Sequence, residues 1–166
     1  MSGTMLARPR PCEAGPPPIV VLPEKLENLV AAFALMPDRQ DRIHALISIA
    51  DRFRPAPPDL ATKPYPEEHR VPACESEAYG FARPLEDGSL EFSFAVENPQ
   101  GISAMAMAVI LSETLSGVPP EQVLEVPRDL PNRIFGPELS MGKSMGLMGM
   151  VSLVHSLARR QLGRPN

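Results

Sequence analysis

Apolar residues recur at helical spacing in two neighbouring segments near the start of the chain. The first segment predicts a helix that begins at Pro23 and ends at Pro37, and the second predicts a helix that is capped by Asp38 and ends at Pro55. The short link predicts that the two helices pack as a hairpin or lie together on a sheet. The apolar faces comprise Leu26, Leu29, Val30, Phe33 and Met36 in the first helix and Ile43, Leu46, Ile47, Ala50 and Phe53 in the second.

The pattern changes to alternation between residues 75 and 97. Leu90, Phe92, Phe94 and Val96 alternate with polar or small residues, which predicts a strand with one buried face. The Asp-Gly pair at 87–88 precedes this strand and is typical of a hairpin turn. The partner strand is therefore expected around residues 75–83, where Tyr79 and Phe81 would supply an aromatic face.

Helical signals return after the strands. Asn98 and Pro99 predict the N-cap and first residue of a third helix, which ends at Gly117 and is apolar nearly all round, as a central buried helix would be. A short helix is expected from Pro119–Glu121 to near Glu125, followed by a loop and a last helix from Met141 to Leu162. The apolar stripe of the last helix is Leu147, Met150, Val151, Val154, Leu157 and Ala158.

The order of two helices, two strands and three helices predicts an α+β fold in which a small antiparallel sheet packs against a layer of helices. Residues 23–162 form the predicted domain. Residues 1–22 are expected to be a proline-rich disordered tail and residues 163–166 a C-terminal tail. Residues 55–69 contain five prolines and are expected to be a surface loop.

Composition narrows the functional classes. The net charge of −4 argues against non-specific nucleic-acid binding, which needs a basic excess. The longest apolar stretch, residues 145–157, is too short for a membrane span, and no apolar signal sequence follows Arg8 and Arg10. Two cysteines cannot form a disulfide scaffold or an all-cysteine zinc site. We therefore expect a cytoplasmic protein with reduced thiols.

Cys74 is the most promising reactive group. It lies where the proline-rich loop enters the first strand, and its small neighbours leave room around the sulfur. Arg70 and His69 would favour the thiolate, whereas Glu75 and Glu77 would oppose it. The residues alone leave open whether Cys74 is buried and inert or reactive. Cys12, in the predicted tail, is expected to be incidental.

The sequence gives little support for other thiol chemistry or for a metal site. The three histidines and Cys74 are not paired at zinc-ligand spacing, and no Cys-x-x-Cys motif is present. Spacing does leave open a cysteine hydrolase that uses Cys74 with His69 or His155. A protein-binding module without thiol chemistry also stays open.

The start of the last helix has an unusual composition. Lys143 is one of three lysines, and Gly142, Gly146 and Gly149 around it permit close backbone approach. Lys143 is either a functional cation or a surface lysine in a glycine-loosened turn. Met141, Met145 and Met148 share a helical face there and are expected to pack into the core rather than bind a soft metal.

Three motifs resemble the SufE family, the sulfur-acceptor partners of cysteine desulfurases in iron–sulfur cluster assembly. Residues 69–79 (HRVPACESEAY) resemble the family's N-R-V-x-G-C-x-S-x-V-W, residues 116–124 resemble S-G-x-T-P-E-E-I-L, and residues 142–150 resemble S-R-x-N-G-L-x-x-M. The motifs fall in family order, and the resemblance spans roughly residues 22–162. Alanine at 73 replaces glycine, tyrosine at 79 replaces tryptophan, lysine at 143 replaces arginine and methionine at 145 replaces asparagine.

The resemblance implies a fold like that of SufE and the scaffold protein IscU, and a sulfur carrier rather than a stand-alone enzyme. Cys74 would accept sulfane sulfur as a persulfide from a SufS-like cysteine desulfurase and pass it to a SufBCD-like iron–sulfur scaffold, with Arg70, Lys143 and His69 in support. The chain itself would need no cofactor, because the pyridoxal phosphate belongs to the desulfurase. One working thiol suits a carrier better than a cluster holder, which commonly needs three or four ligands.

Overall fold

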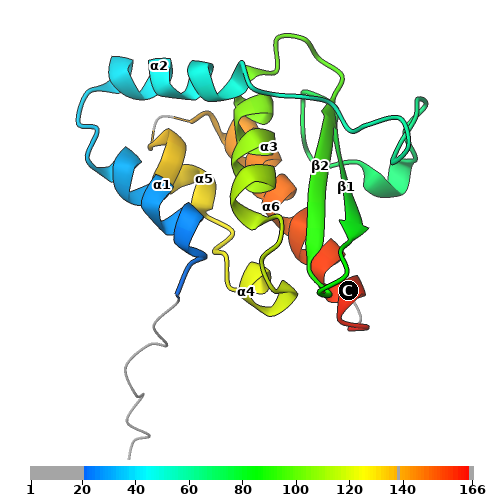
Figure 1. Ribbon diagram of the computed structural model, residues 1–166. Helices are drawn as coiled ribbons and strands as arrows, with labels where there is room; N and C mark the ends of the chain where they lie inside the picture. The colour runs from blue at the N-terminus through cyan, green and yellow to red at the C-terminus, as the bar shows by residue number, and fades with distance from the viewer. Residues whose placement is uncertain (1–20, 138, 165–166) are drawn as a thin grey trace, which may run out of the picture.

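The computed structural model describes residues 21–137 and 139–164 (Figure 1). Most of the predicted tail, including Cys12, lies outside the described residues. In the described part, no helix is both long and apolar enough to cross a membrane. The elements in chain order are α1 (Glu24–Ala34), α2 (Arg39–Ala50), the 3-10 helix η1 (Glu67–His69), β1 (Ala78–Pro84), β2 (Leu90–Val96), α3 (Ile102–Leu115), α4 (Pro120–Leu124), α5 (Leu130–Phe135) and α6 (Met141–Gln161).

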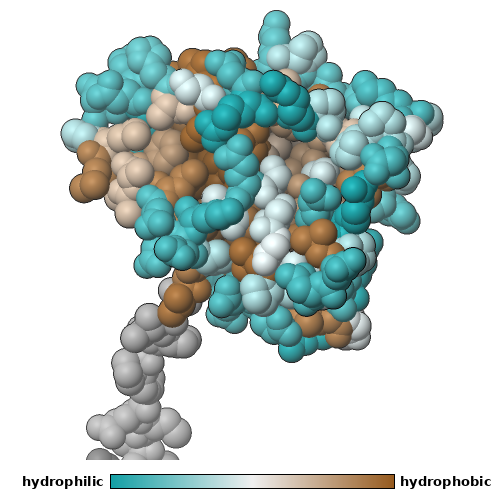
Figure 2. Space-filling model, in the orientation of Figure 1, coloured by the Kyte–Doolittle hydropathy of each residue, from teal (hydrophilic) through white to brown (hydrophobic). Residues whose placement is uncertain are grey.

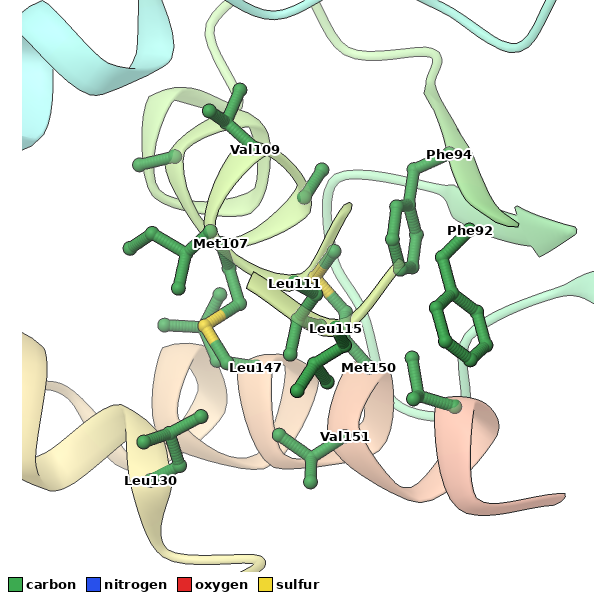
Figure 3. Close-up of a cluster of buried hydrophobic side chains, with 14 of the residues drawn as sticks. Phe92, Phe94, Met107, Val109, Leu111, Leu115, Leu130, Leu147, Met150 and Val151 are labelled. Carbon is green, nitrogen blue, oxygen red and sulfur yellow. The ribbon is translucent and has the colours of Figure 1, made fainter. Parts of the chain in front are cut away.

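The helix α3 lies at the centre of the core, as its apolar sequence predicts. It packs against α1, α2, α6 and β2. Figure 3 shows its side chains meeting those of α6 on one side and the phenylalanines of β2 on the other. The predicted stripe of α6 is buried throughout, so the apolar periodicity of the last helix is confirmed. The fully buried side chains include Phe92, Phe94, Met107, Leu111, Leu115 and Met150.

The two strands form an antiparallel hairpin, and the predicted Asp-Gly turn is confirmed. Gly88 has a φ of 84°, a left-handed conformation that glycine adopts without strain. Gly80 pairs with Phe94 across the hairpin. Phe92 and Phe94 lie on the face of the sheet that packs against the helices. The α+β class with a small helix-covered sheet is therefore confirmed.

The expectation of a single buried sheet face was wrong. Phe81 and Ala95, on the opposite face, are 4% and 1% exposed, because the proline-rich loop folds over them. The ring of Tyr65 lies 5.2 Å from that of Tyr79, and the Ala56 N–H donates to the Phe94 carbonyl at 2.8 Å. The loop thus covers the sheet and leads directly to Cys74.

Three local predictions also need correction. Asn98 does not cap α3; its side chain accepts from the Gln100 N–H in a separate turn, and the helix begins only after Gly101. The expected loop between the last two helices contains α5, a short helix with three buried residues. Ile47, predicted to be buried in α2, is 40% exposed.

Figure 2 shows a mainly hydrophilic surface with apolar residues exposed over α1. The methionine prediction was wrong for two of the three residues, because Met141 and Met145 are 80% and 51% exposed. Met148 is half-buried. The first turns of α6 therefore lie at the edge of the domain, beyond the core that its later turns help to form.

Candidate functional site

Cys74 lies in a loop of two consecutive turns, residues 71–77, between η1 and β1. Both ends of this loop, called here the cysteine loop, are fixed by backbone hydrogen bonds. The Val71 N–H donates to the Ala78 carbonyl at 2.8 Å, and the Asn98 N–H donates to the Ser76 carbonyl at 3.2 Å. Val71 is also buried to 1% exposure, so the start of the loop is anchored in the core.

Two residues of the cysteine loop have left-handed backbone conformations although neither is glycine. Ala73 has a φ of 55° and Glu77 a φ of 48°. A β-carbon disfavours this region by about 1–2 kcal/mol per residue. The Glu77 N–H donates to the Cys74 carbonyl at 3.2 Å, which closes the second turn around the cysteine. The loop is therefore locally strained on both sides of Cys74.

The first half of α6 forms the surface on which this loop rests. A β-carbon at Gly146 would lie 3.1 Å from the Cys74 Cα, and one at Gly149 would lie 2.5 Å from the Pro72 carbonyl oxygen. At Gly142 the corresponding distance to Glu75 Oε1 is 2.6 Å. The predicted close backbone approach is confirmed at Gly146 and Gly149, whereas Gly142 is approached by a side chain. Their spacing of four and three residues puts them on one side of the helix.

Cys74 is half-buried between two hollows. The inner hollow, of about 190 Å³, lies between the cysteine loop and the first turns of two helices. The outer hollow, of about 530 Å³, lies on the side of η1 and includes Arg70. The inner hollow is lined by Cys74, Glu75, Ser76, residues 100–104, Gly142, Lys143, Gly146 and Leu147.

The inner hollow favours negative charge. The helices α3 and α6 both begin there, and a helix N-terminus has a partial positive charge. No described side chain caps α3, while Ser140 caps α6 by accepting from the Lys143 N–H at 3.3 Å. Within the described residues, the Lys143 ammonium group forms no ion pair. The opposing charge is the Glu75 carboxylate, which lies against Gly142.

Arg70 borders the outer hollow, but carboxylates share its charge. Its guanidinium lies 3.3 Å from Glu67 Oε1 and 3.9 Å from Glu77 Oε1. The hydrogen bond that it donates to Glu67 raises the pKa of Arg70 by stabilising the charged form. The structure therefore places Arg70 beside Cys74, as predicted, with less free positive charge than the sequence indicates.

Neither histidine considered for a hydrolase lines a hollow at Cys74. The His69 ring packs against Phe81, and its Nδ1 lies 3.0 Å from the Gly80 carbonyl oxygen. His155 is 5% exposed in α6. Burial lowers its pKa, and the nearby charges of Arg159 and Arg128 act in the same direction. Both rings are thus committed to the packing of the domain rather than to the thiol.

The sequence reasoning did not identify the residues that complete the inner hollow from α3. Gly101 approaches Ser76 so closely that a β-carbon there would lie 2.9 Å from the serine Oγ. Ile102 and Ser103 follow at the start of the helix. The sequence feature that could have identified these residues is Gly101, a glycine directly before an apolar helical stretch. In residues 21–137 and 139–164, no group of three or more His, Cys, Asp or Glu side chains is placed to hold a metal ion.

Comparison with known proteins decides the family. The model of the SufE family, described as an Fe-S metabolism associated domain, matches residues 27–158. The chain belongs to the SufE family. This SufE domain is also similar to the solution structure of a hypothetical protein from Thermus thermophilus, with a TM-score of 0.67 and 25% identity over 86% of this chain and 99% of that one. No match was found among curated proteins.

The strained loop contains the cysteine motif of the SufE family. The SufE motif has glycine at the position of Ala73, and the left-handed φ of 55° is the conformation that glycine adopts most easily. The third motif begins at Gly142 and contains Lys143 and Gly146, so it supplies both the cation and the surface under the cysteine loop. Two motifs that are about 70 residues apart in the SufE domain therefore meet at Cys74.

Proposed function

We propose that this SufE domain accepts sulfane sulfur on Cys74 from a cysteine desulfurase and passes it to an iron–sulfur scaffold. The family places the chain in iron–sulfur metabolism. The observation that supports the specific role is the position of Cys74 in a strained loop between two hollows, one of which favours an anion. A sulfur carrier needs one such accessible thiol.

The proposed transfer is a thiol–disulfide type of exchange. The Cys74 thiolate attacks the terminal sulfur of the persulfide on the desulfurase's cysteine. A new S–S bond forms on Cys74 as the bond to the donor cysteine breaks, and the donor cysteine leaves as a thiolate. The proton of the donor persulfide stays on the transferred sulfur. No external oxidant or reductant is consumed.

The charges around the inner hollow act on both states of the cysteine. The N-termini of α3 and α6 and the Lys143 ammonium line the inner hollow and complement a negatively charged group there. A persulfide on Cys74 would be such a group when it is ionised. The volume of about 190 Å³ exceeds the share of about 30 Å³ that one water molecule occupies in liquid, so one added sulfur atom fits beside Cys74. We assign Lys143 this charge role and Arg70 a weaker one on the outer side.

His69 has a supporting role of another kind in this proposal. Its contacts with Gly80 and Phe81 hold the start of β1, which immediately follows the cysteine loop. The proposal needs no cofactor on this chain, because the pyridoxal phosphate that liberates sulfur from cysteine belongs to the desulfurase. A carrier that uses a free thiol also needs a reducing compartment, so we place the protein in the cytoplasm.

The decisive experiment combines the full chain with a SufS-type cysteine desulfurase and free cysteine. Intact mass spectrometry is expected to show the gain of one sulfur atom, which peptide mapping assigns to Cys74. Cys74→Ser is expected to abolish both the gain and the stimulation of the desulfurase, while Cys12→Ser leaves both unchanged. Full stimulation by Cys74→Ser would overturn the proposal and favour a binding module instead. Turnover without any partner would favour a hydrolase.

A further inference from the structure

A third depression adjoins the inner hollow and extends away from Cys74. This depression, called here the lateral groove, has a volume of about 480 Å³ and lies between α2, the start of α3 and the segment that joins α5 to α6. It shares Ile102, Ser103 and Lys143 with the inner hollow. The lateral groove therefore borders the inner hollow, which Cys74 also lines.

The wall of the lateral groove contains aliphatic side chains that the domain leaves uncovered. Ile43 and Ile47 belong to the apolar stripe of α2, yet Ile43 is half-buried and Ile47 is 40% exposed. Ile102, at the junction of the two hollows, is 46% exposed. Single exposed aliphatic residues are common on proteins, but aliphatic residues gathered in one concave surface are typical of interaction sites. The apolar stripe of α2 is thus wider than the part of it that the domain buries.

The charge of the lateral groove restricts what fits there. Among its described lining residues, Arg42 and Lys143 carry positive charge, and none of the described lining residues carries a carboxylate. The Arg42 guanidinium donates to the backbone carbonyls of Phe33, Met36 and Ile134, so carbonyl dipoles hold its positive charge in place. Lys143 stands at the junction and forms no ion pair with a described residue. An aliphatic segment that has one carboxylate complements this surface.

We infer that the lateral groove is the docking site for the chain segment that flanks the donor cysteine of the desulfurase. The inference rests on the proposed function. In this arrangement the donor cysteine enters the inner hollow at Cys74, an acidic side chain of the segment pairs with Lys143, and aliphatic side chains cover Ile47 and Ile102. The groove thereby adds affinity at a distance from the reacting sulfur atoms and sets which donor is accepted.

The test compares the desulfurase affinity of two matched variants of the full chain. Ile47→Asp places a carboxylate in the groove wall, whereas Leu85→Asp places one at a residue of similar exposure, 38% against 40%, in the hairpin turn. That turn lies at the end of the molecule away from α2 (Figure 1). Ile47→Asp is expected to raise the concentration for half-maximal stimulation at least about tenfold, and Leu85→Asp to change it less than about twofold.

A second pair of variants tests the charge. Lys143→Glu is expected to weaken binding to a similar degree, and Lys143→Arg to retain it. At saturating protein, Ile47→Asp is still expected to gain one sulfur atom on Cys74. Absence of that gain in the wild-type chain would instead defeat the proposed function. Equal behaviour of Ile47→Asp and Leu85→Asp would overturn the groove inference, as would an effect of Ile47→Asp confined to self-association in light scattering.

Discussion

The backbone strain at Ala73 leads to a prediction whose sign is unusual. Replacement of alanine by glycine normally destabilises a protein, because glycine adds conformational freedom to the unfolded chain. Ala73, however, has a φ of 55° and an exposed side chain. Ala73→Gly therefore removes an unfavourable backbone conformation and gives up little packing. We expect the variant to be more stable than the wild type.

The magnitude follows from two opposing effects. Relief of the left-handed conformation contributes about 1–2 kcal/mol, and the added freedom of the unfolded chain costs about 0.4–1 kcal/mol. The free energy of unfolding should therefore rise by about 0.5–1 kcal/mol. For a domain of this size, that gain raises the melting temperature by about 1–4 °C.

Urea denaturation followed by circular dichroism measures this change. The matched control is Ala31→Gly, at an exposed position within α1, where the same substitution should cost about 1 kcal/mol. Opposite signs for the two variants are expected. Equal destabilisation by both would refute the assignment of strain to Ala73. The alkylation rate of Cys74, measured on the same samples, shows whether the relaxed loop exposes the thiol more often.

Three further predictions concern the surroundings of this loop. Gly149→Ala should lower stability by about 1–2 kcal/mol in denaturation, although alanine favours helix, because its β-carbon meets the Pro72 carbonyl at 2.5 Å; a gain would show that the loop does not rest there. Burial lowers the pKa of His155, so only the unfolded state gains this proton below about pH 6.5. The free energy of unfolding should therefore decrease as the pH is lowered below about 6.5, by up to about 1.4 kcal/mol per pH unit. Urea denaturation at pH 7 and at pH 5.5 should show that His155→Leu loses less stability between these two pH values than the wild type does. Arg70→Ala should slow sulfur transfer less than Lys143→Ala in stopped assays, because carboxylates already share the Arg70 charge; the reverse order would contradict the charge assignment.

Local patterns were sufficient for most helices and strands, although α5 was missed. The hairpin follows from alternation and an Asp-Gly turn, and the buried side of α6 follows from its helical period. Asn98 failed as a predicted cap because a tertiary contact decides where α3 begins. Gly101 must approach Ser76 closely, and the helix starts only beyond that contact.

The candidate site was only partly visible in the sequence for a related reason. Cys74 and the glycines near Lys143 stood out as unusual residues, but nothing local joins them. Their contact depends on the packing of α6 against β1, which is a product of the whole core. His69 shows the opposite error, since adjacency in sequence placed it near Cys74 while its side chain packs on the sheet.

The strain in the cysteine loop and the contacts beneath it act against each other. Hydrogen bonds at both ends and the close seat on Gly146 and Gly149 hold the loop down. The left-handed residues Ala73 and Glu77 store about 1–2 kcal/mol each while it stays there. Lifting the loop loses the contacts and releases the strain, so its free-energy cost is smaller than the contacts alone indicate. In the proposed function, Cys74 must be shielded between transfers and reached during them, and this balance would serve both needs. Ala73 in place of glycine shifts the balance toward the lifted loop, because the lifted loop no longer holds the left-handed conformation.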